Sequence, residues 1–212
     1  MAEYTFFFNP MSRAQIARWA LHEAAVDYEP VFVPFDNPPA ALLAANSLGK
    51  LPTVVHHHAG HDHVVTEAAA ICHYLAEMSA PELLPRAHEK ADYFRWMFFA
   101  AGPLEQAVTA RMFGWELSPD QERSAGFGSY ERALDAIAGW LADRDHVCGE
   151  RFTMADVYVG SAIDWGLQFG SIPPRDVFEA YAARCRERPA YREGKAIDGR
   201  LMAEMQGEGG AG

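Results

Sequence analysis

At the start of the chain, the spacing of hydrophobic residues is first typical of a strand and then typical of a helix. An aromatic run over residues 4–8 ends at Asn9-Pro10 and predicts a strand that enters a turn. Residues 13–25 then carry an apolar stripe at helical spacing, which places Arg18 and His22 on the opposite, polar side. The sequence therefore predicts a strand followed by an amphipathic helix.

A second strand-like run covers residues 28–33, so strand, helix and strand form a βαβ unit whose strands should be parallel. A short alanine-leucine helix follows a proline pair, and apolar runs at 51–55 and 63–65 flank a turn at Gly60, as in a hairpin. A further helix has its core-facing stripe at Ile71, Tyr74, Leu75 and Met78. The predicted order is β-α-β-α-β-β-α.

Only helical signals follow residue 89. A long helix over 89–113 should bend at Gly102-Pro103, because proline lacks the amide and its ring clashes with the preceding turn. A second helix, expected to run through residue 141, begins at a capping box of Ser118 and Gln121. A third begins at Thr153 and Asp156 and is apolar all round, which is typical of the centre of a bundle.

Two shorter helices, over 176–187 and 189–203, complete the helical part. The fold class is therefore α/β plus all-α. We expect a first domain at residues 1–79, a linker at 80–88, an all-α domain at 89–205 and a disordered tail at 206–212.

Charge and hydropathy narrow the classes of partner. Lys and Arg total 18 against 29 acidic residues, and the net charge of −11 would repel nucleic acid and anionic membranes. The apolar runs are shorter than a membrane helix requires, and Met1 leads into Glu3 without a secretory core. A cytoplasmic protein with a small-molecule partner is expected.

Cysteine and histidine content raises the question of metal. Three cysteines lie far apart without a Cys-x-x-Cys pattern and are interpreted as small buried hydrophobes. Five histidines crowd the predicted hairpin, but a turn without a cysteine or an ordered second shell more often presents solvated histidines. We expect no functional metal. The histidines are His56, His57, His58, His61 and His63.

Four motifs in order resemble those of cytosolic glutathione transferases, especially the bacterial members and the serine-type theta, zeta and tau classes. They are Asn9-Pro10-Met11-Ser12-Arg13, Gly49-Lys50-Leu51-Pro52-Thr53-Val54, Thr66-Glu67-Ala68-Ala69-Ala70-Ile71 and the Thr153/Asp156 capping box. The resemblance implies a thioredoxin-like first domain, an all-helical second domain, glutathione as co-substrate and a homodimer.

Ser12 stands at a predicted helix N-terminus, where unpaired amides and the helix dipole favour an anion such as a thiolate. The resemblance implies that Ser12 activates the glutathione sulfur, with Asn9 as the second candidate. A hydroxyl at this position could instead serve only to cap the helix.

The other two motifs imply how glutathione is held. By resemblance, Leu51-Pro52 is a cis-proline turn in which the main chain of Leu51 pairs with the cysteinyl part, and Lys50 reaches the glycyl carboxylate or is solvated. The amide of Ala68 would bind the γ-glutamyl carboxylate, and Glu67 would pair with the ammonium or simply favour the helix start. The family usually has serine or threonine where this chain has Ala68.

The expected activity is conjugation of the glutathione thiolate to a small apolar electrophile. The alternatives are glutathione-dependent thiol reduction or isomerisation, and a non-catalytic glutathione- or ligand-binding protein. The resemblance places the electrophile between the two domains. Its candidate contacts are Met11, Glu105, Thr109, Met112 and Trp165.

Overall fold

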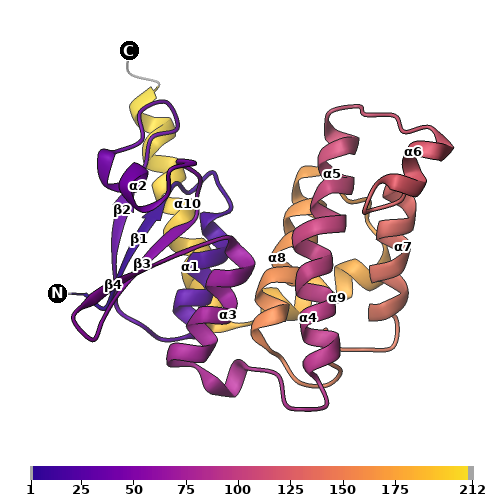
Figure 1. Cartoon of the computed structure of the whole chain (residues 1–212), viewed down its shortest axis with the longest axis horizontal. Helices are drawn as coiled ribbons and strands as arrows, with labels where there is room; N and C mark the ends of the chain where they lie inside the picture. The colour runs from indigo at the N-terminus through magenta and orange to yellow at the C-terminus, as the bar shows by residue number, and fades with distance from the viewer. Residues whose placement is uncertain (1, 210–212) are drawn as a thin grey trace. The chain divides into compact units, whose positions relative to one another are not determined.

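The computed structural model describes residues 2–209 (Figure 1). The internal contacts divide the chain into two compact units, one of Met1–Glu82 with Glu187–Gly212 and one of Leu83–Arg186. This grouping places the last helix with the first unit, whereas the sequence led us to expect it in the helical domain.

The first unit contains a four-stranded sheet in the order β2-β1-β3-β4. β1 and β2 are parallel, while β3 is antiparallel to both β1 and β4, so the predicted βαβαββα order of a thioredoxin-like domain is confirmed. Its elements are β1 Tyr4–Phe8, α1 Ala14–Glu23, β2 Tyr28–Phe32, α2 Ala40–Ala45, β3 Thr53–His58, β4 His61–Thr66, α3 Ala68–Ser79 and α10 Pro189–Gly209.

Alternation along β1 gives each face of the sheet its own cover, because successive side chains of a strand point to opposite faces. Phe7 packs with Val55 of β3 and Leu42 of α2 on one face. Phe6 and Phe8 point to the other face, where the guanidinium of Arg18 from α1 lies over both rings. Helices therefore cover both faces, as a parallel βαβ unit requires.

The predicted polar side of α1 is wrong for Arg18, which is only 1% exposed. α10 packs against α1 (Figure 1), and Arg18 Nε donates to Asp198 of α10 at 2.9 Å. Arg18 Nη1 also donates to the Tyr28 hydroxyl at 2.9 Å. Burial raises the pKa of Asp198, and the Arg18 charge opposes that rise. A helix from the far end of the chain thus converts a surface arginine into a buried, paired one.

The expected disordered tail at 206–212 falls partly within α10, which continues to Gly209. Residues 210–212 lie outside the described part of the chain.

The second unit is helical. The expected helix over 89–113 is interrupted around Pro103 by a π-helical turn, which absorbs the missing proline amide. The elements are η1 Pro81–Leu83, which overlaps the unit boundary, α4 Lys90–Phe99, η2 Ala100–Leu104, α5 Glu105–Met112, α6 Pro119–Ser124, α7 Tyr130–Leu141, α8 Met154–Phe169 and α9 Asp176–Arg186.

The helix expected from Ser118 to Leu141 is instead two helices. The capping box of Ser118 and Gln121 is present, but α6 ends after six residues. Gly128 has a positive φ of 67° and Ser129 begins α7 by accepting a hydrogen bond from the Arg132 amide. The chain already leaves the helix at Ala125, whose ψ is 130°, and Gly128 takes the left-handed conformation just before the start of α7 because glycine adopts it readily.

α8 is buried nearly all round and contacts α4, η2 and α9, which confirms its predicted central place in the bundle. Gly166 allows this packing, because a Cβ there would lie 2.4 Å from Ile172. At the N-terminus, Asp156 Oδ2 accepts hydrogen bonds from the Thr153 amide and hydroxyl. Over residues 2–209, every helix is too short or too polar to span a bilayer.

Candidate functional site

The register of the sheet brings the three candidate segments of the first unit to one edge. Phe7 near the end of β1 is paired with Thr53 at the start of β3, and Thr53 is paired with Thr66 at the end of β4. The segments that continue from these paired positions therefore leave the sheet on the same side. They are the turn at Asn9 to Arg13, the Lys50-Leu51-Pro52 loop and the Glu67-Ala68 start of α3.

Asn9 holds the first of these turns together. Its side chain is buried, its Nδ2 donates to the Val33 carbonyl at 2.9 Å, and its Oδ1 accepts from the Met11 amide at 2.9 Å. Both ends of the amide are thus occupied within the protein. The side-chain amide of Asn9 therefore has a structural task in the turn.

Ser12 follows on the rim of the same turn and is partly exposed. Its hydroxyl donates to the Asn9 carbonyl at 2.8 Å and accepts from the Ala14 amide at 3.1 Å, where α1 begins. Rotation about the Cβ–Oγ bond would redirect the hydroxyl proton to a ligand without moving the oxygen. Ser12 therefore caps the helix and retains the chemistry needed to donate to an anion.

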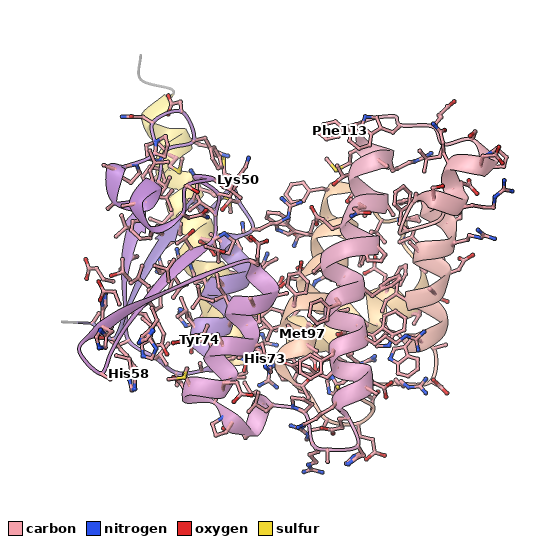
Figure 2. All side chains as sticks on the ribbon, viewed as in Figure 1. Lys50, His58, His73, Tyr74, Met97 and Phe113 are labelled. Atoms are coloured by element: carbon pink, nitrogen blue, oxygen red, sulfur yellow. The ribbon has the colours of Figure 1, made fainter. Side chains whose placement is uncertain are left out.

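The second segment contains Leu51-Pro52, whose peptide bond was expected to be cis. The Leu51–Pro52 bond is cis, as expected. The Lys50 carbonyl accepts from the Asn46 side chain at 3.1 Å and from the Thr53 hydroxyl at 3.0 Å, which secures the loop. Leu51 precedes β3 and lies outside the strand register, so its main chain is available to an extended ligand. The Lys50 side chain is exposed (Figure 2).

The third segment contains a conformation that the sequence analysis missed. Glu67 has φ 64° and ψ 116°, which is unusual for a residue with a side chain. Its side chain is exposed, and Ala68 follows as the first residue of α3, whose leading amides have no intrahelical acceptors. No residue type in the motif signals this backbone, since glycine is absent from it. Strain next to free helix amides is typical of a binding site.

The candidate electrophile contacts come from both units. Glu105, Thr109 and Met112 share a face of α5, and Trp165 lies on α8 with its ring 5.6 Å from Phe169. Met11 belongs to the turn before α1 in the first unit. Beyond α5, the rings of Phe113 (Figure 2) and Trp115 lie 5.6 Å apart, and the two residues are 68% and 62% exposed.

The hairpin histidines are not uniformly solvated. His56 is 1% exposed, because its ring stacks on Tyr4 of the neighbouring strand β1 and its Nδ1 lies 2.9 Å from the Tyr74 hydroxyl of α3. Burial lowers the pKa of His56, and the nearby Glu3 carboxylate opposes that effect. Within residues 2–209, no three His, Cys, Asp or Glu side chains converge as the ligands of an ion.

The cysteines are all free thiols, and Cys72 and Cys185 are buried as expected. Cys148 is partly exposed, which corrects that interpretation, although burial raises the pKa of its thiol to about 12. Burial also raises the pKa of Cys72. Neither thiol is poised to ionise near neutral pH.

Comparison with known proteins adds independent information. The family model "Glutathione S-transferase, N-terminal domain" matches residues 2–77, and "Glutathione S-transferase, C-terminal domain" matches residues 102–189. Glutathione S-transferase 1 of Schizosaccharomyces pombe is 31% identical over 182 residues, covering 78% of this chain and 75% of that protein. GstA of Escherichia coli O157:H7 is 26% identical, covering 74% and 77%.

Solved structures agree with these matches. A theta class glutathione S-transferase from Xanthomonas axonopodis pv. citri with glutathione bound is 27% identical, with a TM-score of 0.70 over 92% of this chain and 97% of that one. A sphingomonad glutathione S-transferase complexed with glutathione is 25% identical, with a TM-score of 0.70 over 92% and 98% of the chains.

Proposed function

The chain belongs to the glutathione S-transferase family, and from that premise we propose that it conjugates the glutathione thiolate to an electrophilic carbon of a small apolar compound. The observation that carries the proposal is the shared sheet edge, where β1, β3 and β4 present the Ser12 turn, the Leu51 main chain and the start of α3 together. These groups match the thiol, the peptide and the carboxylate of one extended tripeptide.

Ser12 is the proposed activating residue. In this proposal its hydroxyl turns from the Asn9 carbonyl and donates to the glutathione sulfur, while the N-terminal end of α1 adds its dipole. Both effects favour the thiolate over the thiol and lower its pKa. Asn9 is the weaker candidate, because its amide is already engaged by Val33 and Met11.

The other contacts would orient the tripeptide. The Leu51 main chain would pair with the cysteinyl residue as an added strand, and Lys50 would attract the glycyl carboxylate. The γ-glutamyl carboxylate would accept from the amide of Ala68 at the start of α3, with Glu67 beside the ammonium. Binding then places the thiolate for attack, so that proximity supplies much of the rate.

The proposed electrophile contacts are Met11 in the first unit and Glu105, Thr109, Met112 and Trp165 in the second. Met112 is 69% exposed, so an apolar compound that covered its side chain would bind more tightly by burying apolar surface. Homodimer formation is a further proposal from the family. Light scattering of the purified protein tests it, and a monomer mass at micromolar concentration would contradict it.

The cysteine chemistry favours conjugation over thiol reduction by an enzyme cysteine. Met11 and Ser12 occupy the activating turn, and burial raises the pKa of both Cys72 and Cys148. A disulfide-exchange assay separates the two reactions, because conjugation proceeds without a mixed disulfide between enzyme and glutathione.

The decisive experiment compares wild type with Ser12→Ala and Ser12→Thr on a panel of electrophiles. Loss of a charge-assisted hydrogen bond of about 1.5–3 kcal/mol predicts a kcat for Ser12→Ala that is roughly 10- to 100-fold lower. Ser12→Thr should retain much of the rate because it keeps the hydroxyl. Spectroscopic titration of bound glutathione should show a higher thiol pKa in the alanine variant.

Unchanged turnover and thiol pKa in Ser12→Ala would remove Ser12 from the mechanism. Retention of wild type on immobilised glutathione without conjugation of any electrophile would favour the non-catalytic alternative instead.

A further inference from the structure

The last helix of the chain contacts the helix that begins directly after the Ser12 turn. α10 packs against α1 (Figure 1), and both helices belong to the first unit. Apart from Pro189, α10 lies outside the two family-model matches, which end at residues 77 and 189. The contacts between α10 and α1 are therefore a feature that the family assignment does not describe.

A glutamine side chain bridges α10 to the Ser12 turn. Lys195 Nζ of α10 donates to Gln15 Oε1 at 2.7 Å, and Gln15 Nε2 donates to the Pro10 carbonyl at 2.5 Å. An ammonium can only donate and a carbonyl can only accept, so both partners require the same orientation of the Gln15 amide. The amide thus connects α10 to the turn in one defined direction.

The hydrogen bond from Gln15 completes the fixation of one peptide group in the turn. The N–H of the Pro10–Met11 peptide donates to Asn9 Oδ1 at 2.9 Å. The carbonyl of the same peptide accepts from Gln15. Because a peptide group is planar, bonds at both of its polar ends fix the orientation of the plane. Ser12 is the next residue, so its position follows from that plane.

Lys195 lies between two other contacts that fix α10 on α1. Its Nζ is 5.5 Å from the centroid of the Tyr191 ring, and that ring meets the Trp19 ring of α1 edge-on with centroids 5.1 Å apart. Three residues after Lys195, buried Asp198 accepts from Arg18 of α1 at 2.9 Å. Contacts on both sides of Lys195 in the sequence therefore hold α10 against α1 at the bridge.

We propose that Gln15 and Lys195 are positioning residues for the transferase reaction, which hold the Ser12 turn through the Pro10 carbonyl. The inference rests on the proposed function, since it assigns a task in that reaction to two residues that do not touch substrate. A charged donor makes a stronger hydrogen bond than a neutral one and polarises the next bond in a chain. The Lys195 ammonium therefore strengthens the bond from Gln15 to the turn.

Two substitutions of Gln15 separate the contact with the turn from the contact with α10. Gln15→Glu keeps an acceptor for Lys195 but has no donor for the Pro10 carbonyl, whereas Gln15→Met loses both. Each should lower kcat for conjugation about 3- to 10-fold, as expected for the loss of one hydrogen bond. The KM for glutathione should change by less than about twofold, because the tripeptide contacts remain. Thermal unfolding should show that Gln15→Glu is as stable as wild type.

Substitutions of Lys195 test the other end of the bridge. Lys195→Met should lower kcat less than Gln15→Met does, because Gln15 can still donate to the Pro10 carbonyl. Lys195→Arg should restore the rate, since arginine is also a charged donor.

Arg188→Met is the matched control. It removes one cation beside α10, as Lys195→Met does, and it also breaks a contact with α1. That contact is with Glu23, the last residue of α1, which accepts from Arg188 Nε at 2.5 Å. The variant should keep kcat within about twofold of wild type, because surface-side changes away from the site seldom alter it more. An equal loss of kcat in Arg188→Met and Gln15→Met would overturn the inference.

Amide hydrogen exchange follows the turn without glutathione or an electrophile. The amides of Met11 and Ser12 both donate to Asn9, so their exchange reports the order of the turn. Exchange at both should be at least about threefold faster in the two Gln15 variants and unchanged in Arg188→Met. Wild-type exchange and kcat in Gln15→Glu would overturn the inference.

The same assays distinguish this inference from the proposed function. Full activity of the Gln15 variants beside a slow Ser12→Ala would overturn this inference alone. Absence of conjugation by wild type would overturn the proposed function and this inference together.

Discussion

Polar groups have different roles in two regions of this protein. In the centre of the helical unit they bond to one another, whereas at the sheet edge of the first unit some have no partner within the fold. In the helical unit, buried Asp156 accepts hydrogen bonds from Thr153, Val147 and Tyr181, so its oxygens are satisfied within the fold. At the sheet edge, Leu51 lies outside the strand register and Ala68 begins a helix whose first amides have no intrahelical acceptor. A closed network stabilises a fold, whereas an open set of donors can receive a ligand.

The residues that precede a helix also differ in backbone conformation between the two regions. The Thr153 cap of α8 is extended, with φ −137° and ψ 173°, as an ordinary helix start is. The Glu67 position before α3 has a positive φ. Such a conformation persists only where the surroundings impose it, and it is common at ligand-binding sites. The comparison predicts that substitutions at Asp156 act on stability and that substitutions at Glu67 act on binding.

Asp156→Ala should have the largest effect on stability. It leaves the Val147 amide and the Tyr181 hydroxyl buried without an acceptor, at a cost of about 3 kcal/mol or more in unfolding free energy. Urea denaturation measures this loss. The matched control Asp143→Ala changes an exposed aspartate and should stay within about 0.5 kcal/mol of wild type. A small loss for Asp156→Ala would mean that the network is not what holds α8.

The Glu89–Arg151 ion pair should make the stability of the helical unit depend on pH. The Arg151 hydrogen bond holds the pKa of buried Glu89 below its ordinary value of 4.5. A depressed carboxyl pKa stabilises the fold above the unfolded-state value and loses that contribution as pH falls through the folded-state value. Glu89→Gln should therefore cost about 2 kcal/mol near neutral pH.

The cost of Glu89→Gln should shrink as the pH falls below 4.5, because wild type then loses the same charge. Denaturation of both proteins across this pH range measures the difference. A gap that stays constant with pH would show that the pair acts through packing rather than charge.

Substitutions at Glu67 should separate strain from charge. Glu67→Gly removes the side chain that disfavours the positive φ and should be more stable than Glu67→Gln by about 1 kcal/mol. Both variants lose the proposed partner of the γ-glutamyl ammonium, so both should bind glutathione more weakly. Calorimetry of glutathione binding and thermal unfolding measure the two effects. Unchanged affinity in both variants would remove Glu67 from the binding site.

Ala68→Ser should have the smallest effect of these substitutions, and it should strengthen glutathione binding rather than weaken it. The added hydroxyl could donate to the γ-glutamyl carboxylate, which predicts glutathione binding that is tighter by about 0.5–1 kcal/mol. Ala70→Ser, two residues along the same helix turn and exposed, is the control and should leave affinity unchanged. Equal affinity for wild type and Ala68→Ser would place the carboxylate elsewhere.

Local pattern was sufficient for much of the fold and for the chemistry of the candidate site. Strand β1 ends at Phe8 as the aromatic run predicts, and the Thr153/Asp156 motif begins α8 because both groups of the cap are three residues apart. The Ser12, Leu51-Pro52 and Glu67-Ala68 motifs are short segments that a sequence displays directly. Each of these features depends on neighbours within a few residues.

Long-range contacts decided the rest. Arg18 has the sequence position of a surface residue, and only the docking of α10, 180 positions later, makes it a buried partner of Asp198. His56 looks like its four hairpin neighbours until the register of β3 with β1 places Tyr4 over its ring. The positive φ of Glu67 lies where β4 joins α3, at a position where the sequence shows no glycine. Periodicity reports which side of an element is apolar, whereas burial depends on what the rest of the chain brings to the other side.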